Sequence, residues 1–332
     1  MDLMVNIDLK KLPVPIRYPE KLLLIGSCFT ENIGTALADL KFPILQNPNG
    51  ILFDPASVSR SIISYIQNKK YTGDDLFQLN EIWNSWSHHS RFSYIEKETC
   101  LQNINQSQQE AHDFIKEADW LFITLGSSFS YRLTDSINPN QSPVSVANCH
   151  RAPAQLFIKH LMGIEEIIGD LNNSLQQLFE FNDKVKVIFT ISPVRHIRDG
   201  VIENNRSKAR LIESVHHLTS QYERVHYFPS YELVIDVLRD YRFYDIDLVH
   251  PNYAATELVL NKFKEFCMDE DSQSLMQELK KISIARKHKA FQPLTNAHLQ
   301  FLKTHLEKVK VLQSQYPFLV MDDELSYFSG SN

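Results

Sequence analysis

The chain has 332 residues, of which 43% are hydrophobic and 22% charged, enough for one large domain or two small ones with their own cores. This composition excludes a disordered chain. The 40 acidic side chains outnumber the 34 basic ones, and the net charge of −6 provides no cationic field for binding nucleic acid.

Three features of the sequence bear on where the protein works. The longest apolar runs, residues 22–25 and 187–191, have the length of buried strands and are too short to span a membrane. The N-terminus, MDLMVNIDLKKLPV, carries charges before residue 10 and lacks the apolar core of a signal peptide. The cysteines, at positions 28, 100, 149 and 267, show no CxxC spacing, as expected of reduced thiols. We therefore expect a soluble, cytoplasmic protein.

The first predicted element is a buried strand at residues 21–26, KLLLIG, which ends in a glycine and leads into a helix with apolar residues at helical spacing. An extended segment is predicted at 42–53. Asp54-Pro55 then opens a helix over 56–67, because aspartate is a good N-cap and proline fits the first helical position.

Residues 70–100 interrupt this alternation. They hold Trp83 and Trp86 among alternating polar and apolar side chains, and predict an inserted hairpin or lid. After a polar helix, buried strands are predicted at 118–126, 184–192 and 224–228. Residues 127–153 are predicted to form a long loop, and helices to cover 154–181, 206–222, 230–238 and 253–267.

From residue 272 the chain is charged and lacks strand signals, and its apolar residues predict two helices around a break at Gln292-Pro293. We expect an α/β domain over residues 1–271 with an insert at about 70–100, and a helical extension over 272–332 that packs on it. Buried strands that alternate with helices predict a parallel sheet covered on both faces. Ligands of such folds bind beyond the carboxyl ends of the strands.

Residue types that can do chemistry follow the predicted strands. These clusters are Gly26-Ser27-Cys28, Asn47 to Gly50, Gly126-Ser127-Ser128, Ser192 to His196 and Asp247 to His250. In the last cluster, His250 follows Asp247 by three residues at a loop–helix junction where Pro251 is predicted to start the helix. This spacing lets the imidazole face a nucleophile while the carboxylate fixes its tautomer. Together with the turn after the first strand, it predicts nucleophilic catalysis.

The string IGSCFTENIG at residues 25–34 resembles the signature of the GSCFA proteins, bacterial members of the SGNH or GDSL hydrolase superfamily. Further blocks resemble this family at 47–55, 123–128, 148–153, 192–200 and 238–251. The resemblance implies a flavodoxin-like SGNH-hydrolase three-layer α/β/α fold with a parallel sheet. It also implies a hydrolase or acyltransferase that acts on an ester or thioester acyl group through a covalent acyl-enzyme.

The register of this resemblance puts Cys28 at the position of the superfamily's usual serine nucleophile and Ser27 at that of its aspartate. A thiol at a helix N-terminus has a lowered pKa, and His250, oriented by Asp247, can deprotonate it. Two alternatives stay open. Ser27 can itself be the nucleophile, or it can cap the helix while Cys28 is a small buried hydrophobe.

In the superfamily, the nucleophile's own amide, a glycine and an asparagine form the oxyanion hole, and here a serine stands where that asparagine is expected. Losing one oxyanion donor typically costs about 10²–10³ in rate, so another residue must substitute. The candidates are Gly50, Asn47, Gly126, Ser127, Ser128 and Asn148.

Two further histidines, His150 and His196, lie in loops that resemble family blocks and are candidates to line the pocket. Arg195 or Arg151 can hold a carboxylate or phosphate of the substrate, because a guanidinium binds such groups through two hydrogen bonds. No zinc-ligand spacing and no GxGxxG loop is present, so we expect neither a metal nor a cofactor.

Two functions of other classes stay open. The serine in place of asparagine favours a catalytically retired SGNH-fold binding protein, whereas the Asp247 and His250 pair argues against it. A scaffold whose helical tail binds a partner predicts an exposed apolar stripe on residues 293–313. Otherwise the expected partner is a small-molecule, glycan or lipid acyl substrate, and not a nucleic acid.

Overall fold

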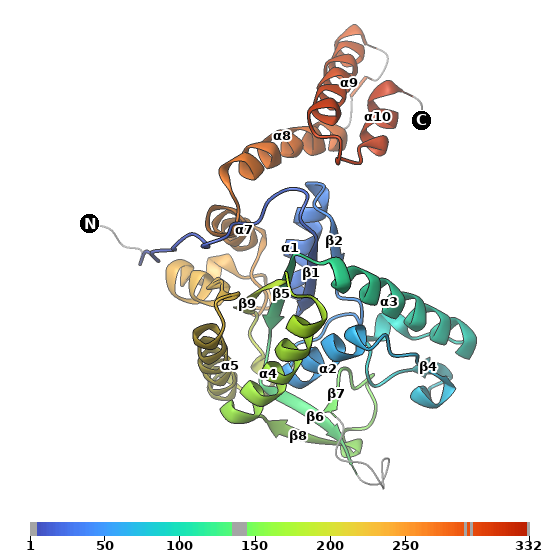
Figure 1. The fold of residues 1–332 in the computed structure, drawn as a ribbon, viewed down its shortest axis with the longest axis vertical. Coiled ribbons are helices and arrows are strands. Elements are labelled where there is room, and N and C mark those ends of the chain that lie inside the picture. The colour runs from blue at the N-terminus through green and yellow to red at the C-terminus, as the bar shows by residue number, and fades with distance from the viewer. Residues whose placement is uncertain (1–4, 135–144, 289–290, 293–294, 331–332) are drawn as a thin grey trace.

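The structure is a computed structural model that describes residues 5–134, 145–288, 291–292 and 295–330 (Figure 1). Its central sheet has five parallel strands in the order β10-β9-β5-β1-β2. These strands are β1 Leu22–Gly26, β2 Ile44–Gln46, β5 Trp120–Leu125, β9 Lys186–Ile191 and β10 Val225–Tyr227. The order is that of flavodoxin-like folds, which confirms the predicted class. The strand order reverses between β1 and β5, so a ligand is expected beyond their carboxyl ends.

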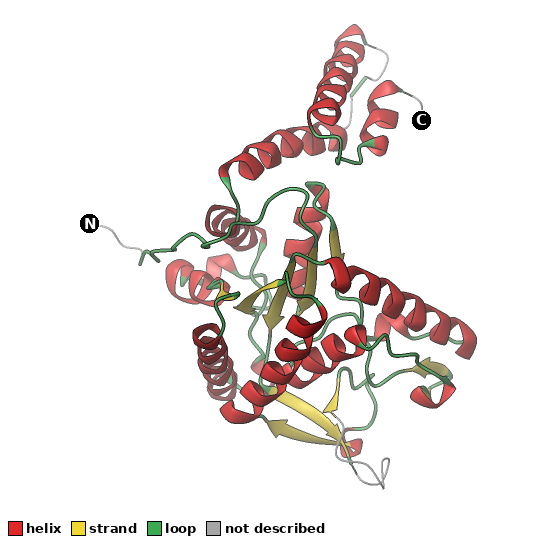
Figure 2. Cartoon of the chain, viewed as in Figure 1, coloured by secondary structure: helices red, strands yellow, loops and turns green. Residues whose placement is uncertain are grey.

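Helices cover both faces of the sheet, as Figure 2 shows. Alternate residues of β1 enter opposite cores, with Leu22 and Leu24 on one face and Leu23 and Ile25 on the other. One face packs against α1 Cys28–Asp39 and α7 Tyr253–Cys267. The other packs against α2 Pro55–Ile66, α3 Lys97–Glu117, α4 Ile164–Phe181 and α5 Val201–Gln221. This double burial explains why the strands form continuous apolar runs.

The segment predicted to be an inserted hairpin or lid does contain a hairpin. Strands β3 Phe77–Leu79 and β4 Ile82–Asn84 pair antiparallel, and they lie beside α3 in Figure 1. The Lys97 ammonium lies 4.7 Å from the centre of the Trp83 ring, which holds the hairpin against the start of α3.

A second sheet corrects two predictions. Residues 127–153 are not only a loop, and 154–181 are not one helix. In their place β6 Phe129–Leu133 pairs antiparallel with β7 Ser145–Val146 and with β8 Phe157–Leu161, and α4 begins only at Ile164. These strands are short and partly exposed, so the alternation of apolar and polar residues along them is weak. The sequence of β8, FIKHL, cannot be distinguished by its periodicity from the first turns of a helix. Part of the predicted loop, 135–144, lies outside the described residues.

Smaller differences concern element ends. The predicted extended segment 42–53 is a strand only over β2, and α5 begins five residues before the predicted helix at 206. The predicted helix 230–238 has one α-helical turn, α6 Ser230–Glu232, that continues as a π-helix over Leu233–Leu238. Short 3₁₀ helices occur at Gly73–Asp75, Ser90–Phe92, Ala154–Leu156, Ile197–Asp199 and Tyr241–Phe243.

In its described residues, the C-terminal extension forms three helices where two are predicted: α8 Glu270–Lys287, α9 Asn296–Gln315 and α10 Asp322–Ser329. Pro293 of the predicted break lies outside the described residues. Val309 and Phe328 join the same core as α1 and α7, and the buried Glu324 forms ion pairs with Lys41 and Arg286. Within 295–313, Leu299 and Val311 are exposed, but they are twelve positions apart in the helix, a spacing that turns them away from a common stripe.

The N-terminal segment also packs against distant sequence. The Leu12 amide donates to the Phe266 carbonyl at 3.0 Å and the Ile16 amide to the Cys267 carbonyl at 2.7 Å. Ile16 and Met268 form a parallel β-bridge. Within the described ranges, every helix is too short or too polar to cross a membrane.

Candidate functional site

The turn after β1 places a serine and a cysteine at the start of α1. Gly26 has a φ of +148°, and a Cβ there would overlap the Thr124 carbonyl group of β5, so the turn requires glycine. Ser27 is the N-cap of α1 and is buried, and its hydroxyl accepts a hydrogen bond from the Phe29 amide at 3.3 Å. Cys28 follows as the first helical residue and is half-buried. This geometry gives the Ser27 hydroxyl a capping role and leaves Cys28 at the end of the helix.

The surroundings of Cys28 correct the expected direction of its pKa. Burial raises the pKa of the thiol, although the amides of Phe29 and Cys28 and the charge of Lys208 act in the opposite direction. Burial therefore favours the neutral thiol over the thiolate. The helix N-terminus alone does not overcome the cost of desolvating a thiolate here.

Lys208 of α5 is a site residue that the sequence analysis missed. Its ammonium nitrogen is buried and donates to the carbonyl oxygens of Gly126 and Ser192, each at 2.6 Å, where β5 and β9 end. Burial lowers the pKa of Lys208 to about 7, and the charge of Cys28 acts against this shift. The sequence contained a signal for this burial. Lys208 shares helical spacing with Leu211 and Val215, which are buried, and so falls on the apolar face of the helix.

The predicted pair Asp247 and His250 is formed. His250 Nδ1 lies 2.6 Å from Asp247 Oδ2, and Asp247 Oδ1 accepts from the amides of Val249 and His250 at 2.9 and 3.0 Å. These bonds, that from the His250 ring first, lower the pKa of Asp247 to about 2. An ionised carboxylate can only accept, so Nδ1 donates and Nε2 is left able to take a proton. Pro251 does not start α7 as predicted, because Asn252 is its N-cap.

The loop that carries His250 contacts the loop after β9. The Arg195 amide donates to the Val249 carbonyl at 3.2 Å. The neighbouring His196 faces the end of β5, since its Nε2 lies 3.4 Å from where a Cβ on Gly126 would be. Burial lowers the pKa of His196 to about 4, and the charges of Lys208 and His250 add to this shift. In the described structure no hydrogen bond joins Cys28 to His250, but Lys208 acts electrostatically on both Cys28 and His196.

The amides predicted for the oxyanion hole already have protein acceptors. The Gly50 amide donates to the Asn47 carbonyl at 2.7 Å, and the amides of Gly126 and Ser127 donate to the Phe53 carbonyl at 2.8 and 3.0 Å. The Ser128 amide donates to the Ser207 hydroxyl at 2.8 Å. The Cys28 amide, the first of α1, has no acceptor within its helix, as is usual for the first turn.

Asn47 links two loops of the site. Its side-chain oxygen accepts from the Gly26 amide at 2.8 Å, and its side chain is fully buried. The Arg91 guanidinium of the insert donates to the Asn47 carbonyl. Asn47 therefore fixes the turn before Cys28 relative to the insert.

Asn148 and His150 lie against the insert. The His150 ring donates through Nε2 to the Ser85 carbonyl at 2.9 Å and packs edge-on against Trp86, while the His150 amide donates to Asn148 Oδ1. Across the described residues, no hydrogen bond connects either of them to Cys28 or His250. The structure thus brings His196 to the sheet edge and leaves His150 beside the hairpin.

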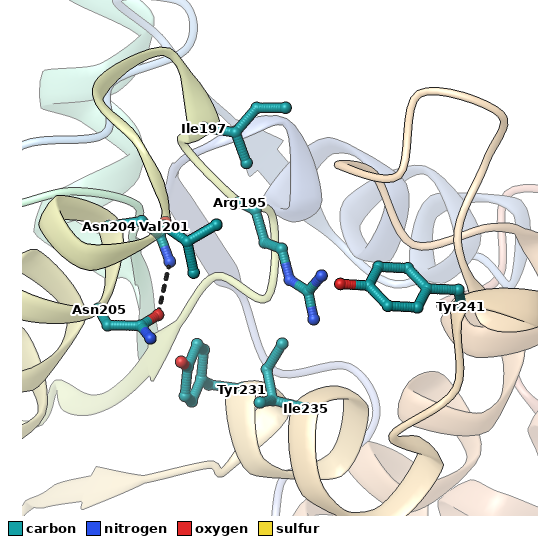
Figure 3. Close-up of a pocket in the computed structure, with 8 residues that line it drawn as sticks. All are labelled: Arg195, Ile197, Val201, Asn204, Asn205, Tyr231, Ile235 and Tyr241. Atoms are coloured by element: carbon teal, nitrogen blue, oxygen red, sulfur yellow. Dashed lines mark hydrogen bonds between the residues drawn. The ribbon is translucent and has the colours of Figure 1, made fainter.

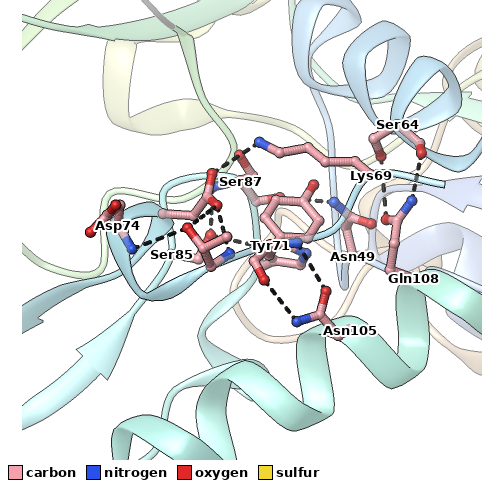
Figure 4. A network of polar contacts seen from close by, with 12 residues as sticks. Asn49, Ser64, Lys69, Tyr71, Asp74, Ser85, Ser87, Asn105 and Gln108 are labelled. Carbon is pink, nitrogen blue, oxygen red and sulfur yellow. Dashed lines mark hydrogen bonds and ion pairs between the residues drawn. The ribbon is translucent and has the colours of Figure 1, made fainter. Parts of the chain in front are cut away.

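A polar network joins the insert to the loop after β2 (Figure 4). The Asn49 side chain donates to the Ser87 carbonyl at 3.0 Å and accepts from the Tyr65 hydroxyl at 2.7 Å. The His89 amide donates to the Asn49 carbonyl at 2.8 Å. The insert is therefore anchored at the turn that contains Gly50, where a Cβ would overlap the His89 side chain.

No group of three or more His, Cys, Asp or Glu side chains that could hold a metal ion occurs in the described part of the chain. A cavity of about 180 Å³, drawn in Figure 3, opens beside the loop after β9 and is lined in part by Arg195, Asn204, Tyr231 and Tyr241.

Comparisons with known proteins identify sequence and structural relatives. The family model for the GSCFA family matches residues 21–263, and that for the GSCFA domain protein, C-terminal domain, matches residues 279–330. No curated protein matches the chain.

Three solved structures resemble the fold at low sequence identity. A family 3 carbohydrate esterase from Talaromyces cellulolyticus shares 14% identity with a TM-score of 0.35, over 79% of this chain and 99% of that one. An acetyl esterase mutant with acetate ion shares 14% identity with a TM-score of 0.36, over the same shares. An acetyl xylan esterase from the rumen bacterium Butyrivibrio proteoclasticus shares 11% identity with a TM-score of 0.35, over 76% of this chain and 64% of that one.

Proposed function

The chain belongs to the GSCFA family, and on this premise we propose that it is an acyl hydrolase or acyltransferase with Cys28 as its nucleophile. His250 is the general base and then the general acid, and Asp247 orients it. The observation that carries the proposal is the Asp247–His250 hydrogen bond, which leaves His250 Nε2 as a proton acceptor in the loop that touches the carboxyl edge of the sheet.

In the proposed reaction, the Cys28 thiol gives its proton to His250 Nε2 while its sulfur attacks the carbonyl carbon of an ester or thioester. The oxyanion that forms lies near the first amides of α1, among them that of Cys28. Its collapse breaks the bond to the leaving alcohol or thiol, which takes the proton from His250. Water or an acceptor then attacks the thioester intermediate with His250 again as base, and the Cys28 thiol is restored.

The raised pKa of Cys28 supports a particular order of events. Because burial favours the thiol over the thiolate, the proposed reaction removes the proton as the sulfur attacks, by general-base catalysis, and does not require a preformed thiolate. Lys208 supports the attack when it is protonated, since its positive charge acts on Cys28. A thioester intermediate reacts readily with amines and thiols, which keeps transfer beside hydrolysis as an outcome.

A second candidate function is that of a binding protein that retains the fold of the enzyme but has lost its catalytic activity. It is favoured by the amides of Gly50, Ser127 and Ser128, which are bonded to protein acceptors instead of being available to an oxyanion. The two candidates differ in whether Cys28 is acylated.

The test is intact-mass measurement of the protein mixed with a short-chain nitrophenyl ester. We expect a transient acyl adduct in the wild type that is absent in Cys28→Ala and forms at least about 100-fold more slowly in His250→Ala. Cys149→Ala is the matched control, because Cys149 is also half-buried but lies in the loop of Asn148 and His150 and not at the start of α1; its adduct should equal that of the wild type.

The remaining outcomes decide between the alternatives. An adduct that survives Cys28→Ala but is lost in Ser27→Ala makes Ser27 the nucleophile. Absence of both adduct and turnover in the wild type, across a panel of ester and thioester chain lengths, contradicts the acyl-enzyme proposal and favours the binding protein.

A further inference from the structure

The cavity beside the His250 loop contains a guanidinium group among polar donors (Figure 3). The central carbon of the Arg195 guanidinium lies 5.1 Å from the Tyr241 ring centre and 4.6 Å from that of Tyr244. Figure 3 shows the guanidinium between Tyr241 and Tyr231, with Asn205 on the far side. The rings of Tyr241 and Tyr244 fix the guanidinium plane by cation–π contact.

Arg195 has no acidic partner in the described part of the chain: no carboxylate lies within ion-pair distance of it. Many other described arginines do, as Arg132 does with Glu166 and Arg286 with Glu324. A half-buried guanidinium held over two rings without a counter-ion keeps its N–H donors for an anion. The cavity also has apolar wall residues, including Ile197 and Ile235, that suit the carbon chain of such a ligand.

Two residues that line the cavity contact elements of the proposed active site. The backbone of Arg195 is bonded to Val249, one residue before His250. On the opposite wall, the Tyr231 ring centre lies 5.9 Å from the ammonium nitrogen of Lys208, which acts on Cys28. A ligand in the cavity would thus meet Arg195, which is bonded to the loop of the general base, and Tyr231, which neighbours Lys208.

One wall is built from an unusual helix. Ile235 belongs to the π-helix Leu233–Leu238, and π-helical turns are frequent at functional sites. The wider turn alters which side chains of the segment meet the cavity.

We propose that this cavity binds an anionic group, a carboxylate or a phosphate, carried by the acyl substrate away from its reacting carbonyl. The substrates would then be esters or thioesters of dicarboxylic or phosphorylated compounds. That the cavity is a substrate site rests on the proposed function. That it binds anions rests on Arg195 and its surroundings alone.

The anion site is tested by calorimetric binding, which needs no turnover. The probes are succinate, methyl phosphate and the neutral analogue succinamide. We expect the wild type to bind succinate or methyl phosphate but not succinamide. Arg195→Met should lose at least about tenfold in affinity, since a hydrogen bond to a charged group is lost. Arg195→Lys should retain part of it, because lysine keeps the charge without the two-pronged geometry.

The matched control is Arg198→Met, which removes an exposed positive charge from the same loop outside the cavity lining and should leave binding unchanged. Unfolding curves establish that the Arg195 variants are folded, and Arg195→Lys keeps the test decisive if Arg195→Met is not. Binding of succinate alone identifies a carboxylate source, and binding of methyl phosphate alone identifies a phosphate source.

The inference is overturned if neither anion binds the wild type or if both Arg195 variants bind as tightly as it does. Anion binding without acylation of Cys28 supports the anion site and contradicts the proposed enzyme. Turnover of a neutral ester without anion binding does the reverse, so the two failures are distinguishable.

Discussion

Lys208 shows how a single side chain connects the sheet to the candidate site. Its ammonium nitrogen spans the ends of β5 and β9 through the Gly126 and Ser192 carbonyls. A neutral amine keeps two N–H donors, so deprotonation leaves both hydrogen bonds possible. Loss of the proton removes the desolvation cost of a buried positive charge, which explains the lowered pKa of Lys208.

This lowered pKa predicts a pH dependence of stability. Between pH 7 and 10.5 an unfolded lysine holds a proton that folded Lys208, with a pKa of about 7, has lost. The unfolded state binds more protons in this window, so the free energy of unfolding rises with pH by up to about 1.4 kcal/mol per pH unit. Lys208→Met lacks this contribution.

Urea unfolding of wild type and Lys208→Met at pH 7, 8 and 9 checks the prediction. The wild type should gain stability relative to the variant at each step. A difference that stays constant with pH would show that Lys208 has an ordinary pKa in the folded protein.

At the scale of elements, the insert and the loop after β2 stabilise each other through Asn49. The Tyr65 hydroxyl of α2 is fully buried and donates to the Asn49 side chain at 2.7 Å. The same asparagine holds the insert through the Ser87 carbonyl. The turn at Gly50 therefore depends on three elements that are separate in the sequence.

Tyr65→Phe should lower the free energy of unfolding by about 1–3 kcal/mol, because it leaves the buried Asn49 oxygen without its donor. Tyr253→Phe removes a hydroxyl from an exposed tyrosine and should change stability by no more than about 0.5 kcal/mol. Urea unfolding of both variants measures the contrast. Equal effects would mean that the Asn49 contact contributes nothing to stability.

The elements that could be predicted from sequence are those whose burial is uniform. β1, β5 and β9 are buried on both faces, so their apolar runs mark them, and Asp54 marks the start of α2 as its N-cap. β6 and β8 pair antiparallel over residues that alternate only partly between buried and exposed positions, and their pairing depends on distant sequence. Periodicity does not carry that information.

The contacts of the candidate site also differ in whether the sequence could predict them. The Asp247–His250 contact spans three residues and so follows from local spacing. The hydrogen bonds of Gly50, Ser127 and Ser128 depend on which backbone groups the fold brings together, and no residue pattern shows that their amides are already occupied. Lys208 was missed, although it shares helical spacing with the buried Leu211 and Val215, because lysine usually lies on the exposed face of a helix.

At the scale of the whole molecule, the C-terminal helices share a core with the α/β layers. Glu324 of α10 is buried between Lys41, which follows α1, and Arg286 of α8, at 2.9 and 3.0 Å. Phe328 and Val309 complete the apolar contact. One acidic side chain thus joins three parts of the chain.

Glu324→Ala should lower the free energy of unfolding by about 1–2 kcal/mol, because it removes the carboxylate of Lys41 and the nearer of the two carboxylates of Arg286, and both cations are still partly reached by water. Asp323→Ala is the control, since Asp323 is exposed and its contact to Arg286 is longer, at 3.4 Å. That control should change stability by less than about 0.5 kcal/mol. Comparable losses in both variants would place the effect in helix α10 itself and not in the buried pair.

The bridge between Ile16 and Met268 has a consequence for biosynthesis. During translation, residues 12–16 leave the ribosome long before their partners at 266–268 exist. At about 5–20 residues per second, that interval lasts roughly ten to fifty seconds. Leu12 and Ile16, buried in the finished protein, stay exposed to water for this time. The nascent chain therefore carries an apolar N-terminal segment that a chaperone can bind until the last helix of the α/β layers is made.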